Sequence, residues 1–131
     1  MEYEKDFKSW NKVKEMLDEN SQGISFYEKE IWWCSLGVNV GHEQDGKGSM
    51  FIRPVYILKK INSNMFIGIP LTSNLKNDYA HIAFYFNYDL STATISQTRI
   101  LDKKRLFNRI GITSDYLHNK MKKATVAFIL S

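Results

Sequence analysis

Residues 30–73 read EIWWCSLGVNVGHEQDGKGSMFIRPVYILKKINSNMFIGIPLTS, and this pattern predicts a series of antiparallel strands. Apolar runs at Glu30–Leu36 and Ile52–Lys60 flank a long polar loop, Gly37–Ser49, and another run follows at Met65–Leu71. The residues Asn62–Asn64 predict a tight hairpin turn, because asparagine tolerates the left-handed backbone that such turns need.

Similar short runs continue towards the C-terminus, at His81–Phe86 and Ala93–Gln97, after the polar loop Ser73–Asp78. Short strands at regular spacing, separated by turn residues, are typical of an antiparallel sheet that curls into a small barrel. The predicted fold class is therefore mainly β, of the α+β kind, with helices at the two ends of the chain.

The N-terminal residues predict an amphipathic helix, because apolar side chains recur at three- and four-residue steps between charged ones. The polar residues 20–23 end this pattern. Such a helix either packs its apolar stripe on the main body or covers the surface of a partner. The stripe consists of Tyr3, Phe7, Trp10, Val13 and Leu17.

A second helix is predicted near the C-terminus. Thr113, Ser114 and Asp115 can cap its first turn, because their side-chain oxygens accept hydrogen bonds from backbone N–H groups. Its lysines lie on the other faces and are expected to be solvated. The apolar stripe of this helix consists of Leu117, Met121, Ala124 and Phe128.

The composition indicates one domain with a real hydrophobic core. The chain has 131 residues, of which 44% are hydrophobic, and its single cysteine, Cys34, cannot form an internal disulfide. The charged N-terminus has no apolar signal region, and no apolar run approaches the ~18 residues of a membrane span, so we expect a cytoplasmic protein. A net charge of +4 weakly favours nucleic acid or an acidic protein as partner.

Arg53 and Pro54 open the second strand directly after the polar loop. Because proline has no N–H, this pair is expected at a strand start or an edge. The planar guanidinium of Arg53 matches two phosphate oxygens at once, although a surface salt bridge is an equal alternative. The loop itself carries His42, Glu43, Gln44, Asp45 and Lys47, which together could handle an anion.

Hydroxyl and amide side chains follow two other strands. Thr72 and Ser73 can bind a phosphate oxygen, but capping the next turn is the more common role of such hydroxyls. Gln97 and Arg99 can read a base edge or hold a backbone. His42 in the loop can transfer a proton near neutral pH.

Other kinds of site receive little support. The scattered histidines and single cysteine predict no metal site and no cofactor. Gly46, Lys47 and Gly48 lack the spacing and the following helix of a P-loop, so nucleotide binding is not expected. His81 and His118 are interpreted as structural.

Taken in order, these segments resemble the PemK/MazF family of toxins from type II toxin–antitoxin systems, over residues 30 to 111. The segments that carry the resemblance are the EIWW run, Gly41–Gly46, Arg53–Val55, Pro70–Ser73, Gln97–Asp102, and Arg105 with Leu106.

The resemblance implies an SH3-like antiparallel barrel in residues 25–131, preceded by an N-terminal helical extension in residues 1–24. It implies a homodimer that cleaves single-stranded mRNA without a metal, silenced by a cognate acidic antitoxin. The usual catalytic arginine and threonine fall on Arg53 and Thr72.

The residues that can carry this chemistry form two sets. The catalytic candidates are Arg53, Thr72 and His42, and the RNA-binding candidates are Glu43, Gln44, Lys47, Ser73, Gln97 and Arg99. Ser96 stands where many family members carry an aspartate, so the resemblance does not identify the general base. Alternatives are a non-catalytic toxin that binds a protein such as DNA gyrase, and a passive RNA-binding barrel.

Overall fold

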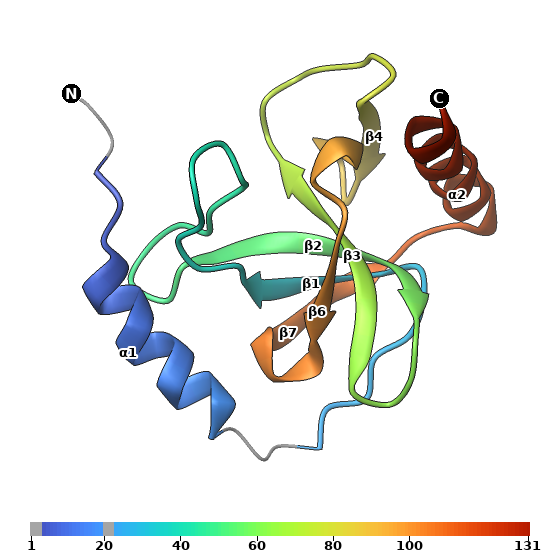
Figure 1. Cartoon of the computed structure of the whole chain (residues 1–131). Coiled ribbons are helices and arrows are strands. Elements are labelled where there is room, and N and C mark those ends of the chain that lie inside the picture. Colours follow the sequence, from blue (N-terminus) through green and yellow to red (C-terminus); the bar gives the residue numbers. More distant parts are fainter. Residues whose placement is uncertain (1–3, 20–22) are drawn as a thin grey trace.

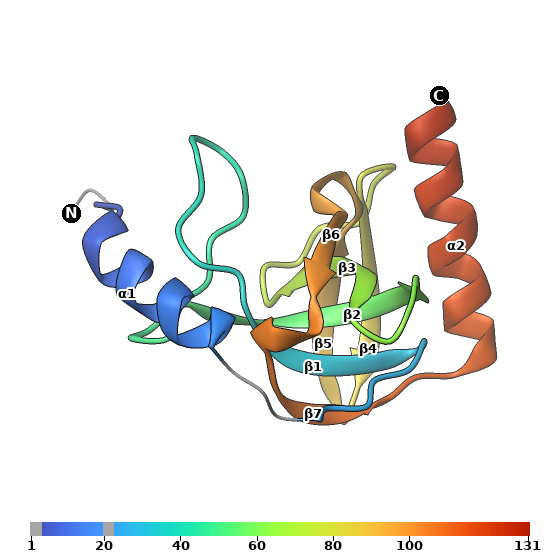
Figure 2. The same cartoon turned by 60° about the horizontal axis from the view of Figure 1, so that its bottom comes forward.

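The computed structural model describes residues 4–19 and 23–131 and has an antiparallel seven-stranded sheet with a helix near each end of the chain. Helix α1 and helix α2 lie on opposite sides of the β structure in both views (Figures 1 and 2). The elements are α1 Phe7–Asp18, β1 Glu30–Ser35, β2 Ile52–Lys60, β3 Met65–Thr72, β4 His81–Phe86, β5 Asp89–Thr94, η1 Ile95–Gln97, β6 Arg99–Asp102, η2 Lys103–Arg105, β7 Leu106–Ile112 and α2 Asp115–Leu130.

Strand β3 connects the two halves of the sheet. The strand order is β4-β5-β3-β2-β1-β7, and β6 pairs with β3 outside this path. Residues 65–70 of β3 pair with β2 and β6, whereas its last residues, Leu71 and Thr72, pair with Ala93 and Thr92 of β5. The pairings among the described residues form an open path, so the predicted closure into a barrel is not confirmed, but the mainly β, α+β class is.

Most of the predicted strands are confirmed. The ranges Ile52–Lys60 and His81–Phe86 match β2 and β4, and β1 and β3 differ from prediction by one residue. The strand predicted at Ala93–Gln97 is wrong: β5 begins at Asp89 and ends at Thr94, and the remaining residues form the 3₁₀ helix η1. Strands β6 and β7 were not predicted, because exposed residues of both kinds, such as Ile100 in β6 and Arg109 in β7, hide the alternation. Pairing with β3 and β1 holds the two strands in place.

The hairpin at residues 62–64 is confirmed, but its mechanism differs from the expected one. Asn62 accepts hydrogen bonds at its side-chain oxygen from the backbone N–H groups of Asn64 (2.8 Å) and Met65 (2.9 Å). A left-handed backbone is found instead in the turn that joins β4 to β5, at Asn87 and Tyr88, with φ of 50° and 66°. That turn brings the start of β5 back along the sheet.

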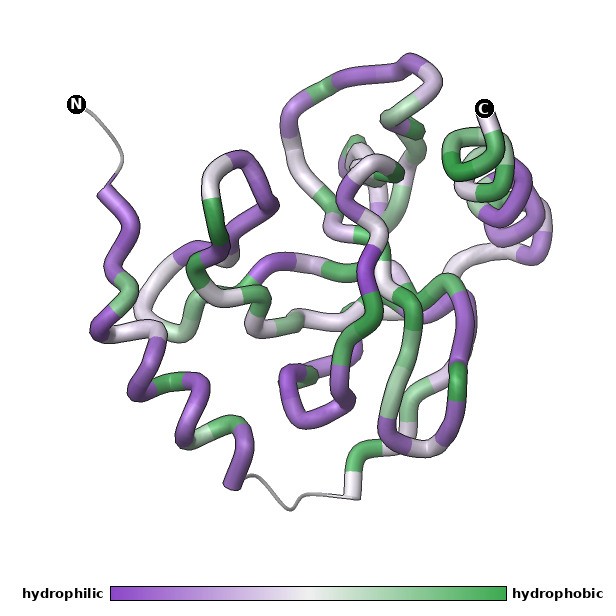
Figure 3. The backbone as a smooth tube through the Cα atoms, viewed as in Figure 1, coloured by the Kyte–Doolittle hydropathy of each residue, from purple (hydrophilic) through white to green (hydrophobic). Residues whose placement is uncertain are grey.

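The core shows the alternation expected of a strand. Trp32 is buried with Cys34 in the cluster that also contains Phe66, whereas Trp33 on the opposite face is 38% exposed. Figure 3 shows the hydrophobic residues concentrated along β2 and β3. Burial raises the pKa of the Cys34 thiol to about 12, as befits a buried small hydrophobe.

Helix α1 packs on the body of the protein. Its Trp10 and Leu17 are buried together with Val38 and Phe51 from outside the helix. The packing alternative is therefore the one this structure adopts. Tyr3 and residues 20–22 lie outside the described residues.

Helix α2 begins as predicted, with the side-chain oxygen of Ser114 accepting from the N–H of Leu117 at 3.2 Å. Met121 is fully buried, and Leu117, Ala124 and Phe128 pack half-buried against the same core cluster.

A buried histidine ties α2 to the sheet. The Nδ1 atom of His118 lies 2.5 Å from the hydroxyl of Tyr56, and its Nε2 atom lies 3.6 Å from the carboxylate of Glu28. Burial, followed by the nearby positive charge of Lys122, lowers the pKa of His118 from its usual 6.5. The fold thus prefers the neutral imidazole.

We therefore expect the free energy of unfolding to fall as the pH drops below about 6.5, because the unfolded chain then protonates His118 more readily than the folded one. The contribution is at most about 1.4 kcal/mol per pH unit, the value for one proton. Urea unfolding of the wild type and of His118→Gln across pH 5 to 8, a range about the usual histidine pKa, measures it. Equal pH slopes for the two proteins would contradict this role of His118.

Candidate active site

A surface cleft of about 660 Å³ brings together side chains from separate strands. Arg53 at the start of β2 and Thr72 at the end of β3 both line it, as predicted from their positions. The other lining residues are Trp33, Lys47, Gly48, Ile52, Pro54, Leu71, Ser73, Asp89, Leu90 and Ser91. Two residues 19 positions apart in sequence thus face one cavity, because β2 and β3 are hydrogen-bonded neighbours.

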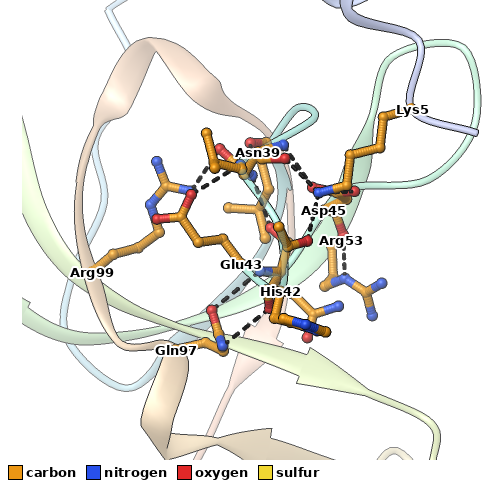
Figure 4. Close-up of polar contacts among 12 residues, drawn as sticks. Lys5, Asn39, His42, Glu43, Asp45, Arg53, Gln97 and Arg99 are labelled. Carbon is orange, nitrogen blue, oxygen red and sulfur yellow. Dashed lines mark hydrogen bonds and ion pairs between the residues drawn. The ribbon is translucent and has the colours of Figure 1, made fainter.

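Arg53 lines the cleft and is only 8% exposed. Its Nε donates to the carbonyl oxygen of Asp45 at 2.8 Å, and its Nη1 donates to that of Leu71 at 3.3 Å (Figure 4 shows the Asp45 contact). With its amide oxygen turned to the guanidinium, Gln44 accepts from Nη2 at 2.9 Å. The sequence predicted a guanidinium that reaches outward; instead, the group is oriented by main-chain carbonyls.

The contact to Leu71 also joins Arg53 to the strand end that carries Thr72, because Leu71 directly precedes Thr72 in β3. Thr72 is half-buried, and its hydroxyl oxygen accepts from the N–H of Asn74 at 3.3 Å. The capping role is therefore real, yet a hydroxyl that accepts one hydrogen bond can still donate its own hydrogen into the cleft.

The loop of residues 37–51, called here the 37–51 loop, is closed at its base by backbone hydrogen bonds. The N–H of Gly46 donates to the carbonyl of Gly37 at 2.8 Å, and the N–H of Leu36 donates to that of Phe51 at 2.9 Å. A Cβ on Gly46 would lie 1.5 Å from the carbonyl oxygen of Phe51, so only glycine fits there.

The candidates at the tip of the loop lie apart from the cleft lining. His42 and Glu43 are exposed, and the Glu43 carboxylate accepts from the N–H of Val40 at 3.0 Å. Of the residues predicted in this loop, Lys47 lines the cleft, and Gln44 reaches it through Arg53.

Gln97 and Arg99 hold the loop from the side of η1 and β6 (Figure 4). The side-chain oxygen of Gln97 accepts from the N–H of Gln44 at 3.1 Å, and its amide nitrogen donates to the carbonyl of His42 at 3.5 Å. The guanidinium of Arg99 reaches the side-chain oxygen of Asn39 at 3.5 Å. Both side chains are thus engaged in loop contacts, and their role towards RNA stays a prediction.

Sequence reasoning missed one wall of the cleft. This wall is the start of β5, with Asp89, Leu90 and Ser91. Asp89 adds a carboxylate to the cleft that Arg53 and Thr72 also line, and the sequence had identified no general base. The strand start was missed because β5 was predicted to begin at Ala93. The left-handed residues Asn87 and Tyr88 mark this turn in retrospect, and an asparagine before the strand was the available signal.

Within residues 4–19 and 23–131, no three histidine, cysteine or acidic side chains are grouped so that they could hold a metal ion. In the same part of the chain, no helix combines the length and the hydrophobicity needed to cross a membrane.

Comparison with known proteins gives one family and a consistent set of structures. The sequence model of the family described as PemK-like, MazF-like toxin of type II toxin–antitoxin system matches residues 27–129. The chain is similar in fold to MazF from Deinococcus radiodurans, with a TM-score of 0.69 and 16% identity, over 82% of this chain and 99% of the other. No curated protein sequence gives a significant match.

Two mycobacterial structures are similar as well. An endoribonuclease from a mycobacterial species, solved in complex with its cognate antitoxin, has a TM-score of 0.59 and 13% identity, over 79% of this chain and 93% of the other. Mycobacterium tuberculosis toxin MazF-mt6 has a TM-score of 0.56 and 15% identity, over 75% of this chain and 93% of the other. At these identities the structural likeness concerns the fold.

Proposed function

The chain belongs to the PemK-like, MazF-like family of toxins of type II toxin–antitoxin systems, and we propose that it is a metal-independent endoribonuclease acting on single-stranded mRNA. One observation carries the proposal: Arg53 and Thr72 line the same cleft and are connected through the carbonyl of Leu71. A guanidinium and a hydroxyl at one cavity are suited to gripping a phosphodiester.

The reaction needs no metal, because RNA carries its own nucleophile. The 2′-oxygen attacks the adjacent phosphorus, so the O2′–P bond forms and the P–O5′ bond breaks. One proton leaves the 2′-hydroxyl and another reaches the departing 5′-oxygen. The products are a 2′,3′-cyclic phosphate and a free 5′-hydroxyl.

Each role falls to a group that the cleft can supply. Arg53, held by Asp45 and Leu71, stabilises the charge that grows on the phosphoryl oxygens and gives the departing 5′-oxygen its proton. Thr72 donates its hydroxyl hydrogen to a phosphate oxygen. Asp89, by its position in the cleft, accepts the proton of the 2′-hydroxyl, a role in which His42 is the competing candidate.

RNA is bound by charge and by stacking. Lys47 adds positive charge at the cleft. Trp33, 38% exposed in the same cleft, offers a ring face on which a base stacks. Ser73 lies next to Thr72 in the lining and binds the neighbouring linkage. The other proposed RNA-binding residues either belong to the 37–51 loop or contact it from outside. They are Glu43 and Gln44 in the loop, and Gln97 and Arg99 beside it.

The family also suggests how the protein is assembled and controlled. We propose an SH3-like barrel that forms a homodimer in the cytoplasm, bound by a cognate acidic antitoxin. The mycobacterial endoribonuclease was solved in complex with its own antitoxin, which supports a partner of this kind. The net charge of +4 suits an acidic inhibitor.

The direct test incubates purified protein with a long single-stranded RNA in EDTA and maps the ends of the products. Cuts at defined sites that leave cyclic or 3′-phosphates and 5′-hydroxyls support the proposal. RNA that stays intact while expression remains toxic would favour a toxin that binds a protein target. RNA that is bound but stays intact, with no toxicity, would favour a passive RNA-binding protein.

Two variants decide whether Asp89 or His42 is the general base. We expect Asp89→Asn to slow cleavage by about 10²–10⁴, the usual contribution of a positioned acid or base, and His42→Asn to slow it far less, because His42 lies outside the cleft lining. Single-turnover cleavage rates of both variants measure this. A large loss only for His42→Asn would assign the base to the loop.

A further inference from the structure

One lysine ties the N-terminal segment to the 37–51 loop. Lys5, which directly precedes the N-cap residue of α1, donates from Nζ to the carbonyls of Asn39 and Gly41, the latter at 2.8 Å. Its Nζ also lies 3.4 Å from a carboxylate oxygen of Asp45. The side chains of Lys5 and Asp45 are only 20% and 12% exposed, so water screens this ion pair weakly. Figure 4 shows Lys5 pointing into the loop from outside it.

Asp45 connects Lys5 to Arg53 in the cleft. Its other carboxylate oxygen accepts from the N–H of Asn39 at 2.6 Å, which holds the two sides of the loop together. Its backbone carbonyl accepts from Nε of Arg53 at 2.8 Å. A shift of Asp45 therefore moves the group that orients the guanidinium.

Helix α1 holds Lys5 at a defined place. The carboxylate of Asp6 accepts from the N–H of Ser9 at 3.0 Å and so caps the helix one residue after Lys5. Trp10 packs beneath both ends of the loop. Its ring lies 5.6 Å from that of Phe51, and a Cβ on Gly37 would come within 2.1 Å of it. Figure 2 shows α1 beside the base of this loop.

We propose that Lys5 is a positioning residue that holds Asp45, and through it the guanidinium of Arg53, in the arrangement used for RNA cleavage. The effect on cleavage rests on the proposed function, whereas the effect on Arg53 does not. Lys5 precedes residue 27, where the match to the family begins, so the extension supplies a part of the site that the family domain itself lacks. The N-terminal helix then stabilises the arrangement of Arg53 in the active site by holding Lys5 in place.

A lysine suits this position better than a neutral side chain. An ammonium has three donors, and here it meets two carbonyl oxygens and one carboxylate. Lys5→Met removes the cation that lies 3.4 Å from the half-buried carboxylate of Asp45, and losing one member of a shielded charge pair costs stability. The loop should then populate conformations in which Asp45 has moved away from Arg53.

The test compares Lys5→Met, which keeps the length of the side chain, with Lys5→Arg and with Lys12→Met, a change at an exposed lysine within α1. The first readout is hydrogen exchange, by NMR, of the Nε–H of Arg53 and of the N–H of Asn39. The second is kcat and KM on a short single-stranded RNA. The full chain is used throughout.

We expect Lys5→Met to speed exchange of both groups by about tenfold, to lower kcat by about tenfold and to change KM little, as a loosened but still formed site would. Lys5→Arg should keep most of the slow hydrogen exchange and most of the kcat of the wild type. Lys12→Met should match the wild type in both. Equal exchange at Arg53 in Lys5→Met and Lys12→Met would overturn the proposal. If the wild type does not cleave RNA but Lys5→Met still frees the Arg53 Nε–H, the proposed function fails and the positioning role stands.

Discussion

Arg53→Ala should lower the rate of RNA cleavage by at least 10²–10³, roughly the loss found when one preorganised donor is removed from a charge-stabilising site. The guanidinium is held in the cleft wall by the carbonyls of Asp45 and Leu71, so it needs no reorganisation as charge develops on the phosphate. Because this interaction strengthens in the transition state, kcat and kcat/KM should fall together. Single-turnover cleavage measures the rate of the chemical step, and RNA-binding titrations measure the affinity for RNA, which should change little.

Two controls make this result specific. Arg53→Lys keeps the charge but not the planar fork, and we expect it to recover only a small part of the rate. Thermal unfolding of each variant shows whether the loop and strand contacts of Arg53 are needed for folding. A folded Arg53→Ala protein that cleaves RNA at the wild-type rate would remove Arg53 from the mechanism and leave the fold unaffected.

Phe66→Ala should cost about 3–5 kcal/mol of the free energy of unfolding, the usual range for truncating a buried phenylalanine. Phe66 is fully buried in β3, and its ring lies 5.3 Å from that of Phe26, which comes from the segment before β1. Its removal opens a cavity at the point where this segment meets the sheet. Urea unfolding monitored by circular dichroism measures the change.

The matched control is Phe7→Ala. Phe7 is 53% exposed at the start of α1, so the same truncation there should change stability by no more than about 0.5 kcal/mol. Similar losses for the two variants would mean that burial in β3 is not what makes Phe66 important. A loss of less than about 1 kcal/mol at Phe66, typical of an average substitution, would have the same meaning.

Strands with a clear local signal were predictable, and those without one were not. The apolar run of β2 and the alternation of β4 mark their own boundaries, because burial on one or both faces constrains every residue. Strand β7 has three exposed residues among its seven, and its conformation depends on pairing with β1, which the local sequence cannot report. The start of β5, with Asp89, was lost for a similar reason.

The residues of the candidate site also differ in whether the local sequence could identify them. Arg53 and Thr72 could be chosen from the sequence because their motifs and strand-end positions are local features. The contacts of Gln97 and Arg99 with the loop could not, since they join residues more than 50 positions apart. The role of Lys5 was equally hidden, because a lysine ahead of an amphipathic helix looks like any solvated charge.

The amino-acid sequence by itself determined the secondary structure of β1 to β4, the helices at the two ends and the pair of residues suited to a phosphodiester. Periodicity, turn residues and capping residues act over a few positions, so they can be read along the chain. The tertiary structure alone decided that the Arg53 guanidinium turns onto carbonyls, that Asp89 joins the cleft and that Lys5 reaches Asp45. These are contacts between distant segments, and only the folded chain brings them within hydrogen-bonding distance.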